Sequence, residues 1–151
     1  MKLLHRRLTG EDPHAAGLTL LEMLYGAPLP EIRRTPLGKP YFVDTPLHFS
    51  ISHTPNYVFA AISDTPIGID AEEKDRDIKL SLAEKLLSEK ELAQFQKAED
   101  KRLALLKFWV LKEASGKCAG QGMQLWPNHT DFSLDDPRVQ EIDGCLVAVI
   151  E

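Results

Sequence analysis

The sequence contains no hydrophobic run long enough to span a lipid bilayer. Its longest apolar stretches, such as CLVAVI at residues 145–150, are far shorter than the roughly 20 residues that a transmembrane helix requires. The N-terminal MKLLHRRLTGEDPH also lacks the apolar centre of a signal peptide. We therefore expect a cytoplasmic protein with no membrane partner.

Cysteine and net positive charge are also scarce. The two cysteines, Cys118 and Cys145, have no metal-binding spacing, which fits a reducing compartment, and we expect both to pack as small apolar side chains. The net charge of -5 argues against a general nucleic-acid binder, so no nucleic-acid partner is expected. Basic residues still gather in the first quarter of the chain and permit a local basic patch: Arg6, Arg7, Arg33, Arg34 and Lys39.

Several motifs of nucleotide-binding and hydrolytic proteins are missing. The sequence has no Walker phosphate loop, no GxGxxG segment and no serine, histidine and aspartate order of a hydrolase. No residue-level repeat is visible. The 151 residues fit one domain, or two small halves that share a core.

The first part of the chain predicts one helix followed by strands. Asp12-Pro13 is a typical helix start, and Gly26 a typical stop. After a proline-rich connector, HFSISHT and YVFAAIS around TPN predict a β-hairpin. PIGID is a third extended run, in which Gly68 indicates that another backbone approaches closely.

The second part repeats this order of helix and strand. A helical stretch begins near Ile78, with Ser88 and Glu91 as a capping box, and a long helix follows from about Asp100 to Ala119. FSL, RVQEI and CLVAVI predict closing strands, the last two joined by a type I′ turn at Asp143-Gly144. We predict an α+β fold with two similar halves of helix plus antiparallel sheet, residues 1–69 and 70–151, in one compact unit.

The long helix carries charges near its apolar stripe. At 100° per residue, Lys117 projects within the stripe and Glu113 lies at its flank, whereas Lys112 points to the opposite side. An unpaired buried charge is costly, so both inward charges need partners. They either pair with each other at i,i+4 or contact something charged outside the helix. The stripe itself consists of Leu103, Leu106, Val110, Ala114 and Cys118.

Three carboxylates could form one metal site. In IGIDAEE, Asp70 and Glu72 are two residues apart and point to one side if the strand continues through Ala71. With Glu113 as a third ligand, this oxygen set suits Mg²⁺. The alternative is that AEEKDRD is a solvated acidic loop.

Two further residues have both a functional and a structural interpretation. His53, just before a turn, is either a ligand-binding or an ordinary structural histidine. Lys39 lies between a glycine and a proline, a geometry that can present its ammonium group to a phosphate, although lysines beside turns are common.

The order of GKP, SISHT, IGIDAE and FWVLKEASGKCAGQG resembles that of the Sfp-type 4'-phosphopantetheinyl transferases. Their hallmark is Gly-Ile/Val-Asp, followed further along the chain by Trp-x-x-Lys-Glu-Ala-x-x-Lys. Both parts occur here without departure, and the resemblance covers nearly the whole chain. Related holo-acyl-carrier-protein synthases place the Ile-Ser-His-Thr strand after the lysine-glutamate helix, so this order favours the Sfp type. The matching residues are Gly68, Ile69, Asp70, Trp109, Lys112, Glu113, Ala114 and Lys117.

The resemblance implies a pseudo-twofold fold and a Mg²⁺-dependent reaction between the halves. The 4'-phosphopantetheine arm of coenzyme A would pass to a serine of an apo acyl or peptidyl carrier protein, releasing adenosine 3',5'-bisphosphate. By resemblance, Glu113 and Lys117 are the catalytic residues, with Glu113 or a metal-bound water that it orients as the base. By the same resemblance, Asp70, Glu72 and Glu113 match the metal ligands, and Lys117 matches the lysine that contacts the pyrophosphate. His53 matches the histidine at the 3'-phosphate of coenzyme A, and Arg6, Arg7 and Arg34 lie where basic residues help to hold that 3'-phosphate. Gly38, Lys39 and Pro40 match the segment that lines the adenine side.

One expectation concerns a departure from the family. The chain begins where relatives already have several dozen residues, so the resemblance implies weakened coenzyme A affinity rather than lost metal binding.

Two other functions are alternatives to the transferase. They are a binding module for carrier proteins or coenzyme A that lacks transferase activity, and an unrelated Mg²⁺ phosphohydrolase. A monomer is expected. Leucines and Phe95 between Ile78 and Gln96 either contact the carrier protein or pack in the core.

Overall fold

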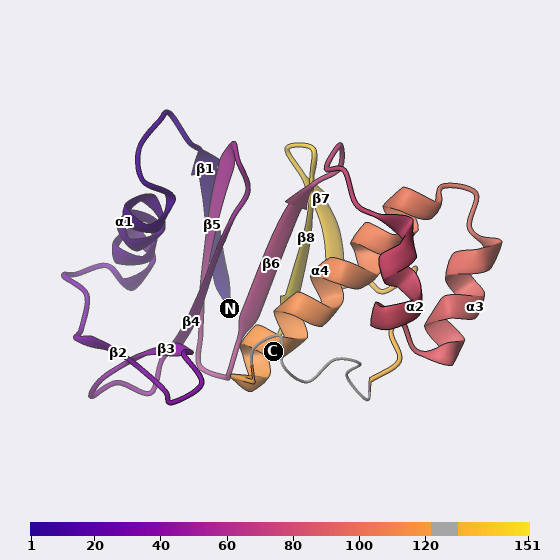
Figure 1. The fold of residues 1–151 in the computed structure, drawn as a ribbon. Helices are drawn as coiled ribbons and strands as arrows, with labels where there is room; N and C mark the ends of the chain where they lie inside the picture. Colours follow the sequence, from indigo (N-terminus) through magenta and orange to yellow (C-terminus); the bar gives the residue numbers. More distant parts are fainter. Residues whose placement is uncertain (122–129) are drawn as a thin grey trace.

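The computed structural model describes residues 1–121 and 130–151, which form the layers shown in Figure 1. In chain order the elements are β1 (Lys2–Arg7), α1 (Pro13–Tyr25), β2 (Ile32–Arg34), β3 (Pro40–Phe42), β4 (His48–His53), β5 (Tyr57–Ser63), β6 (Gly68–Glu73), the 3₁₀ turn η1 (Leu80–Leu82), α2 (Ala83–Leu86), α3 (Glu89–Lys97), α4 (Lys101–Ala119), β7 (Val139–Ile142) and β8 (Cys145–Ile150). The predicted α+β class is confirmed. None of the described helices is both long and apolar enough to cross a membrane.

The first sheet has the order β1-β5-β4 and is antiparallel throughout. The predicted β4–β5 hairpin is confirmed, and α1 covers the outer face of the sheet (Figure 1). The Asp12 side chain accepts a hydrogen bond from the Ala15 N–H, and Gly26 ends α1 with a φ of 83°, as the sequence predicted. Strand β1 and the short β2–β3 hairpin were not predicted, because short strands with charged ends resemble connectors.

The second sheet has the order β6-β8-β7 and is also antiparallel. Asp143 and Gly144 join β7 to β8 with φ angles of 49° and 77°, so the predicted type I′ turn is confirmed. The strand predicted at FSL is wrong. The backbone of residues 132–134 instead makes hydrogen bonds with side chains of α3, since the N–H groups of Phe132 and Leu134 donate to Glu91 and Gln94.

The two sheets pack face to face. Because side chains point alternately to the two faces of a strand, Phe59 of β5 and Ile69 of β6 point into the interface between the sheets. The same alternation turns Asp70 and Glu72 toward α4. The neighbouring edges β4 and β6 are joined by serine side chains, because the Ile69 and Ala71 N–H groups donate to the hydroxyls of Ser50 and Ser52 at 3.0 and 3.1 Å.

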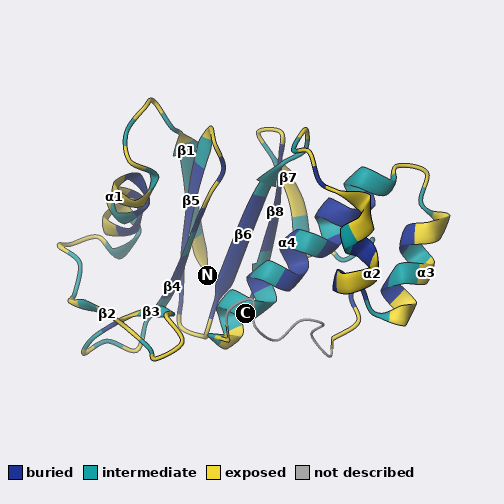
Figure 2. Ribbon diagram, viewed as in Figure 1, coloured by how far each residue is buried: buried dark blue, intermediate teal, exposed yellow. Residues whose placement is uncertain are grey.

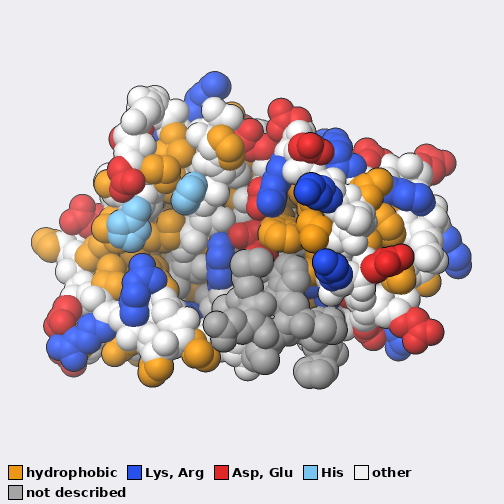
Figure 3. All heavy atoms as spheres, in the orientation of Figure 1, with side chains coloured by type: hydrophobic (Ala, Val, Ile, Leu, Met, Phe, Trp, Pro, Cys, Tyr) orange, Lys and Arg blue, Asp and Glu red, His pale blue; other side chains and the backbone are white. Residues whose placement is uncertain are grey.

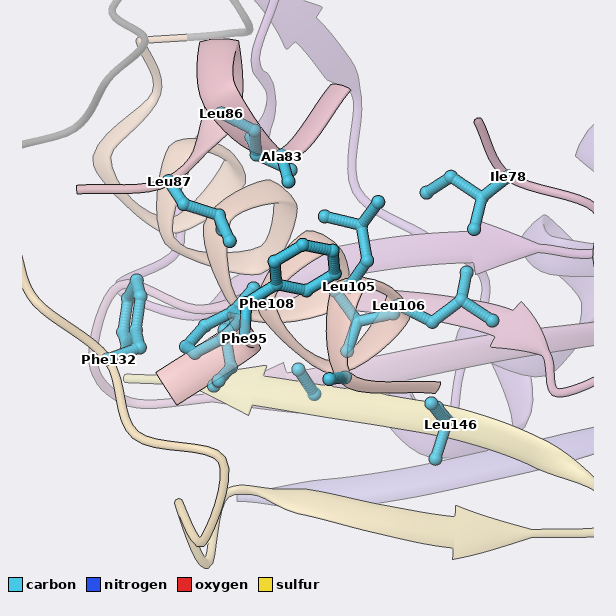
Figure 4. Packing of buried hydrophobic residues seen from close by; sticks show 14 of the residues in the cluster. Ile78, Ala83, Leu86, Leu87, Phe95, Leu105, Leu106, Phe108, Phe132 and Leu146 are labelled. Carbon is cyan, nitrogen blue, oxygen red and sulfur yellow. The ribbon is translucent and has the colours of Figure 1, made fainter. Parts of the chain in front are cut away.

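Helix α4 is buried on two sides, by the second sheet and by the layer of η1, α2 and α3 (Figure 2). In the core of this region, Phe108 of α4 belongs to the same hydrophobic cluster as Leu87, Phe95 and Phe132 (Figure 4). Leu86, Leu87 and Phe95 are therefore core residues, which confirms the packing alternative for this stretch.

The second buried side corrects the prediction for Lys112. We expected an outward side chain, but Lys112 is fully buried and its Nζ lies 2.7 Å from Glu91 Oε1. Glu91 also accepts the N–H groups of Ser88 and Phe132 at 2.9 and 3.0 Å. A single-stripe analysis of α4 could not show that α3 covers its other face.

Candidate active site

The site begins where α4 crosses β6 at Gly68. A Cβ atom at Gly68 would lie 1.9 Å from Ala114 O and 2.4 Å from Cys118 N, so the predicted close approach of another backbone is confirmed. Only glycine lets the helix approach the strand this closely. The crossing brings the second half of α4 directly over the carboxylates of β6.

Lys117 joins the helix to the strand. Its Nζ donates to Asp70 Oδ1 at 2.8 Å and to Ile69 O at 3.0 Å. Among the described residues Lys117 forms its ion pair with Asp70 and not with Glu113, so the i,i+4 alternative is wrong. Ser52 lies beside the same carboxylate, with its Oγ 3.4 Å from Asp70 Oδ1.

Two buried carboxylate oxygens have no hydrogen-bond partner among the described residues. They are Asp70 Oδ2 and Glu113 Oε1. Burial raises the pKa of Glu113 to about 7, and the negative charge of Asp70 acts in the same direction. Burial also raises the pKa of Asp70, although Lys117 opposes this. Buried oxygens that lack donors and sit beside another negative charge are suited to a cation.

Glu72 lies on the same side of β6 and is paired with Arg76. The Arg76 guanidinium is also 4.9 Å from the ring centre of Trp109. Burial raises the pKa of Glu72, and Arg76 opposes it. Because β6 continues to Glu73 and Asp70 is buried, the solvated-loop alternative is wrong for these two carboxylates.

The three predicted metal ligands are neighbours but are not gathered around one point. Within the described part of the chain, no three His, Cys, Asp or Glu side chains are placed to hold one metal ion. Asp70 and Glu113 present free oxygens, whereas Glu72 faces Arg76. Two carboxylates fit part of a Mg²⁺ shell, since this ion usually takes one or two carboxylates and completes its shell with water and phosphate oxygens.

A cavity of about 730 Å³ opens beside the carboxylates. Basic and apolar side chains share its wall, as expected of a pocket for a ligand with a flat ring and phosphates. The structure brings Arg34, Lys39, Pro40, His53 and Lys117 together here, as the sequence predicted. Its wall consists of His14, Leu18, Ile32, Arg33, Arg34, Leu37, Gly38, Lys39, Pro40, Phe49, Ser50, Ile51, His53, Gly116, Lys117 and Gly120.

Lys39 connects the β2–β3 hairpin to the end of α4. Its Nζ donates to Cys118 O at 2.6 Å, and its stem lies close to Gly120. Burial lowers the pKa of Lys39. The Arg34 guanidinium donates to Gly38 O at 2.8 Å, which fixes the GKP turn at the cavity wall. His53 is exposed, and its Nδ1 is 3.4 Å from Thr54 O.

Arg6 and Arg7 do not belong to the described wall of this cavity. Arg6 pairs with Glu11 and donates to Arg7 O at 3.0 Å. Sequence reasoning missed Arg76 and Ser52, which contact the carboxylates directly. The alternation of polar residues within the otherwise apolar FSIS was a signal for Ser52, whereas Arg76 was hidden within a charged run.

Figure 3 shows acidic and basic side chains lying together in the middle of the molecule, where β6 and α4 meet. The fold and the site thus define an α+β protein with a basic cavity beside buried carboxylates. The sequence model of the 4'-phosphopantetheinyl transferase superfamily matches residues 66–146, and the chain belongs to this superfamily. The predicted resemblance is confirmed, and the matched segment includes Asp70, Glu72, Glu113 and Lys117.

Three relatives carry the name of the same activity. The 4'-phosphopantetheinyl transferase gsp of Aneurinibacillus migulanus is 36% identical over 112 residues, which cover 73% of this chain and 46% of the relative. The transferase psf-1 of Bacillus pumilus is 33% identical over 109 residues, 69% of this chain and 46% of the relative. The transferase Sfp of Bacillus subtilis (strain 168) is 38% identical over 92 residues, 58% of this chain and 40% of the relative. The matched segments span about half the length of these curated relatives.

Proposed function

We propose that the protein transfers the 4'-phosphopantetheine arm of coenzyme A to a serine hydroxyl of an apo acyl or peptidyl carrier protein. Adenosine 3',5'-bisphosphate is the second product. The observation that carries this proposal is the position of Lys117, which lines the cavity and at the same time pairs with Asp70. The Lys117 side chain therefore lies between the basic cavity, which suits a ligand with phosphates, and the carboxylates. Membership in the transferase superfamily supports the same reaction.

Coenzyme A is the proposed occupant of the cavity. Gly38, Lys39 and Pro40 would line the adenine side, and His53 and Arg34 would face the 3'-phosphate. All five belong to the cavity wall, which supports these roles. Lys117 would then contact the diphosphate. The roles proposed for Arg6 and Arg7 have less support, because neither belongs to the described wall.

Mg²⁺ is the proposed cofactor, held by Asp70, Glu72 and Glu113. The unpartnered oxygens of Asp70 and Glu113 support two of these ligands, whereas the pairing of Glu72 with Arg76 gives the third less support. When bound, the ion would neutralise charge on the diphosphate and on the leaving bisphosphate.

The residues of this chain would then act on the serine and the diphosphate. The serine oxygen attacks the phosphorus atom next to the pantetheine arm, and the bond from that phosphorus to the bridging oxygen of the diphosphate breaks. Lys117 stabilises the negative charge that develops on the leaving group. Glu113 accepts the serine proton, directly or through a water.

The proposed arrangement of the site between two related halves, residues 1–69 and 70–151, has topological support. Apart from the β2–β3 hairpin, the first half runs β1, α1, β4 and β5, and the second runs β6, a group of helices, β7 and β8; in each of the two three-stranded sheets the last strand lies between the other two. We propose a pseudo-twofold relation between the halves and a monomeric protein. Light scattering that showed a trimer would contradict the monomer.

The test is intact-mass spectrometry of an apo acyl carrier protein incubated with coenzyme A, Mg²⁺ and this protein. The expected result is the addition of one phosphopantetheine, absent with EDTA. Glu113→Gln should abolish the transfer and retain the circular dichroism spectrum of the folded chain. If coenzyme A and carrier protein bind without any product, the chain is a binding module instead. Release of free phosphopantetheine or phosphate without a carrier would indicate a phosphohydrolase.

A further inference from the structure

Two cations of the protein lie against the proposed metal ligands. Lys117 pairs with Asp70 at 2.8 Å, and Arg76 pairs with Glu72. Three carboxylates thus face two positive side chains, and the two unpartnered oxygens belong to Asp70 and Glu113. Lys117 also lines the cavity and has a role in the proposed reaction, whereas Arg76 has no role there.

Arg76 is held firmly at this place. Its guanidinium lies over Trp109 and against Glu72. Its backbone N–H donates to Glu73 O at 2.9 Å, and its carbonyl oxygen accepts from Arg102 Nη1 at 3.2 Å. These contacts keep the positive charge of Arg76 beside Glu72.

We propose that Arg76 is an internal counter-ion that competes with the divalent cation for Glu72, so that the metal binds tightly only together with the diphosphate. This inference rests on the proposed function. A dication added to three ionised carboxylates, Arg76 and Lys117 leaves an excess of positive charge, which is unfavourable in a half-buried site. The negative diphosphate removes that excess. Binding of metal and of coenzyme A is therefore cooperative, and Arg76 sets the size of the coupling.

Removing the charge of Arg76 should strengthen metal binding to the ligand-free protein. In Arg76→Gln we expect the Kd for Mn²⁺, measured without coenzyme A, to fall about tenfold. The gain in Mn²⁺ affinity on adding coenzyme A should shrink, because without the charge of Arg76 the diphosphate has less excess positive charge to offset. Arg76→Lys retains the positive charge and should bind Mn²⁺ nearly as the unmodified protein does.

Arg138→Gln is the matched control. Arg138 pairs with Asp136 at 2.7 Å, outside the candidate site, and its loss changes the net charge of the protein by the same amount. This variant should leave both Mn²⁺ affinities unchanged. Asp70→Asn tests the site itself and should weaken Mn²⁺ binding with and without coenzyme A.

The experiment is a titration of each variant with Mn²⁺, followed by the electron paramagnetic resonance signal of the free ion, with and without coenzyme A. Thermal unfolding confirms that each variant is folded. Tighter binding by Arg76→Gln, with Arg138→Gln unchanged, supports the inference. Equal or weaker binding by Arg76→Gln, with Asp70→Asn still impaired, overturns it and leaves the proposed metal site intact. If Asp70→Asn binds Mn²⁺ normally, the metal site of the proposed function is itself wrong, and the inference falls with it.

Discussion

Replacing Glu113 by glutamine should stabilise the metal-free protein at neutral and alkaline pH. In the folded chain burial raises the pKa of this carboxyl from 4.5 to about 7. The folded state therefore keeps a proton that the unfolded chain releases, and the free energy of unfolding falls as pH rises through this window. Glutamine has a similar shape and cannot ionise, so it avoids this loss.

The size of the effect follows from the shift in pKa. At full strength the shift corresponds to about 3 kcal/mol, and partial exposure of Glu113 to water reduces this to about 1–2 kcal/mol. For a domain of this length each kcal/mol moves the unfolding temperature by roughly 2–4 °C. Glu113→Gln should thus unfold about 2–8 °C higher than the unmodified protein above about pH 7, with no gain below about pH 4.5.

The assay is thermal unfolding followed by circular dichroism in EDTA, between about pH 5 and pH 8. Glu22→Gln, at an exposed position of α1, is the control for loss of one negative charge. Its effect should stay constant across this range. If the unfolding temperature of Glu113→Gln is no higher at pH 8, or is raised equally at pH 5, ionisation of the buried carboxylate does not destabilise the folded state and the prediction is refuted. With Mg²⁺ and coenzyme A present, only the unmodified protein should gain stability strongly.

Two other substitutions test the packing that positions the site. Gly68→Ala places a Cβ against Ala114 O and Cys118 N, so α4 must move away from β6; we expect a loss of about 1–3 kcal/mol in chemical denaturation and reduced transfer. An unchanged denaturation midpoint would show that the helix does not approach the strand this closely. Lys112→Met leaves Glu91 as an unpaired buried charge and should cost about 3–5 kcal/mol. Adding Glu91→Gln should recover much of this loss, and no recovery would contradict the ion pair as its cause.

Much of the fold could be predicted because local signals decided it. The cap at Asp12, the turn at Asp143-Gly144 and the β4–β5 hairpin depend on residues close together in the sequence. Strand β1 could not be predicted in this way. Its partner β5 lies far along the chain, and the strand KLLHRR has no alternating pattern of its own.

The residues of the candidate site were predicted well, whereas the side chains that form ion pairs with them were not. The carboxylates of β6, and Glu113 and Lys117 of α4, lie together as expected, because a two-residue period and a helical period fix their directions. Their counter-ions were not foreseen. Tertiary packing determines these ion pairs: Lys117 pairs with Asp70, Arg76 pairs with Glu72, and Lys112 pairs with Glu91 of α3.

The serine hydroxyls between β4 and β6 influence how this fold can diverge in evolution. A main-chain ladder fixes the register of two strands along their whole length, whereas Ser50 and Ser52 fix only the positions that they contact. Changes at these two positions can therefore shift one sheet along the other without rebuilding either one. Such a shift would alter the distance from the cavity to the carboxylates. Selection for a different substrate could act on Ser50 and Ser52, provided that the apolar side chains between the sheets, such as Phe59 and Ile69, repack with the shift.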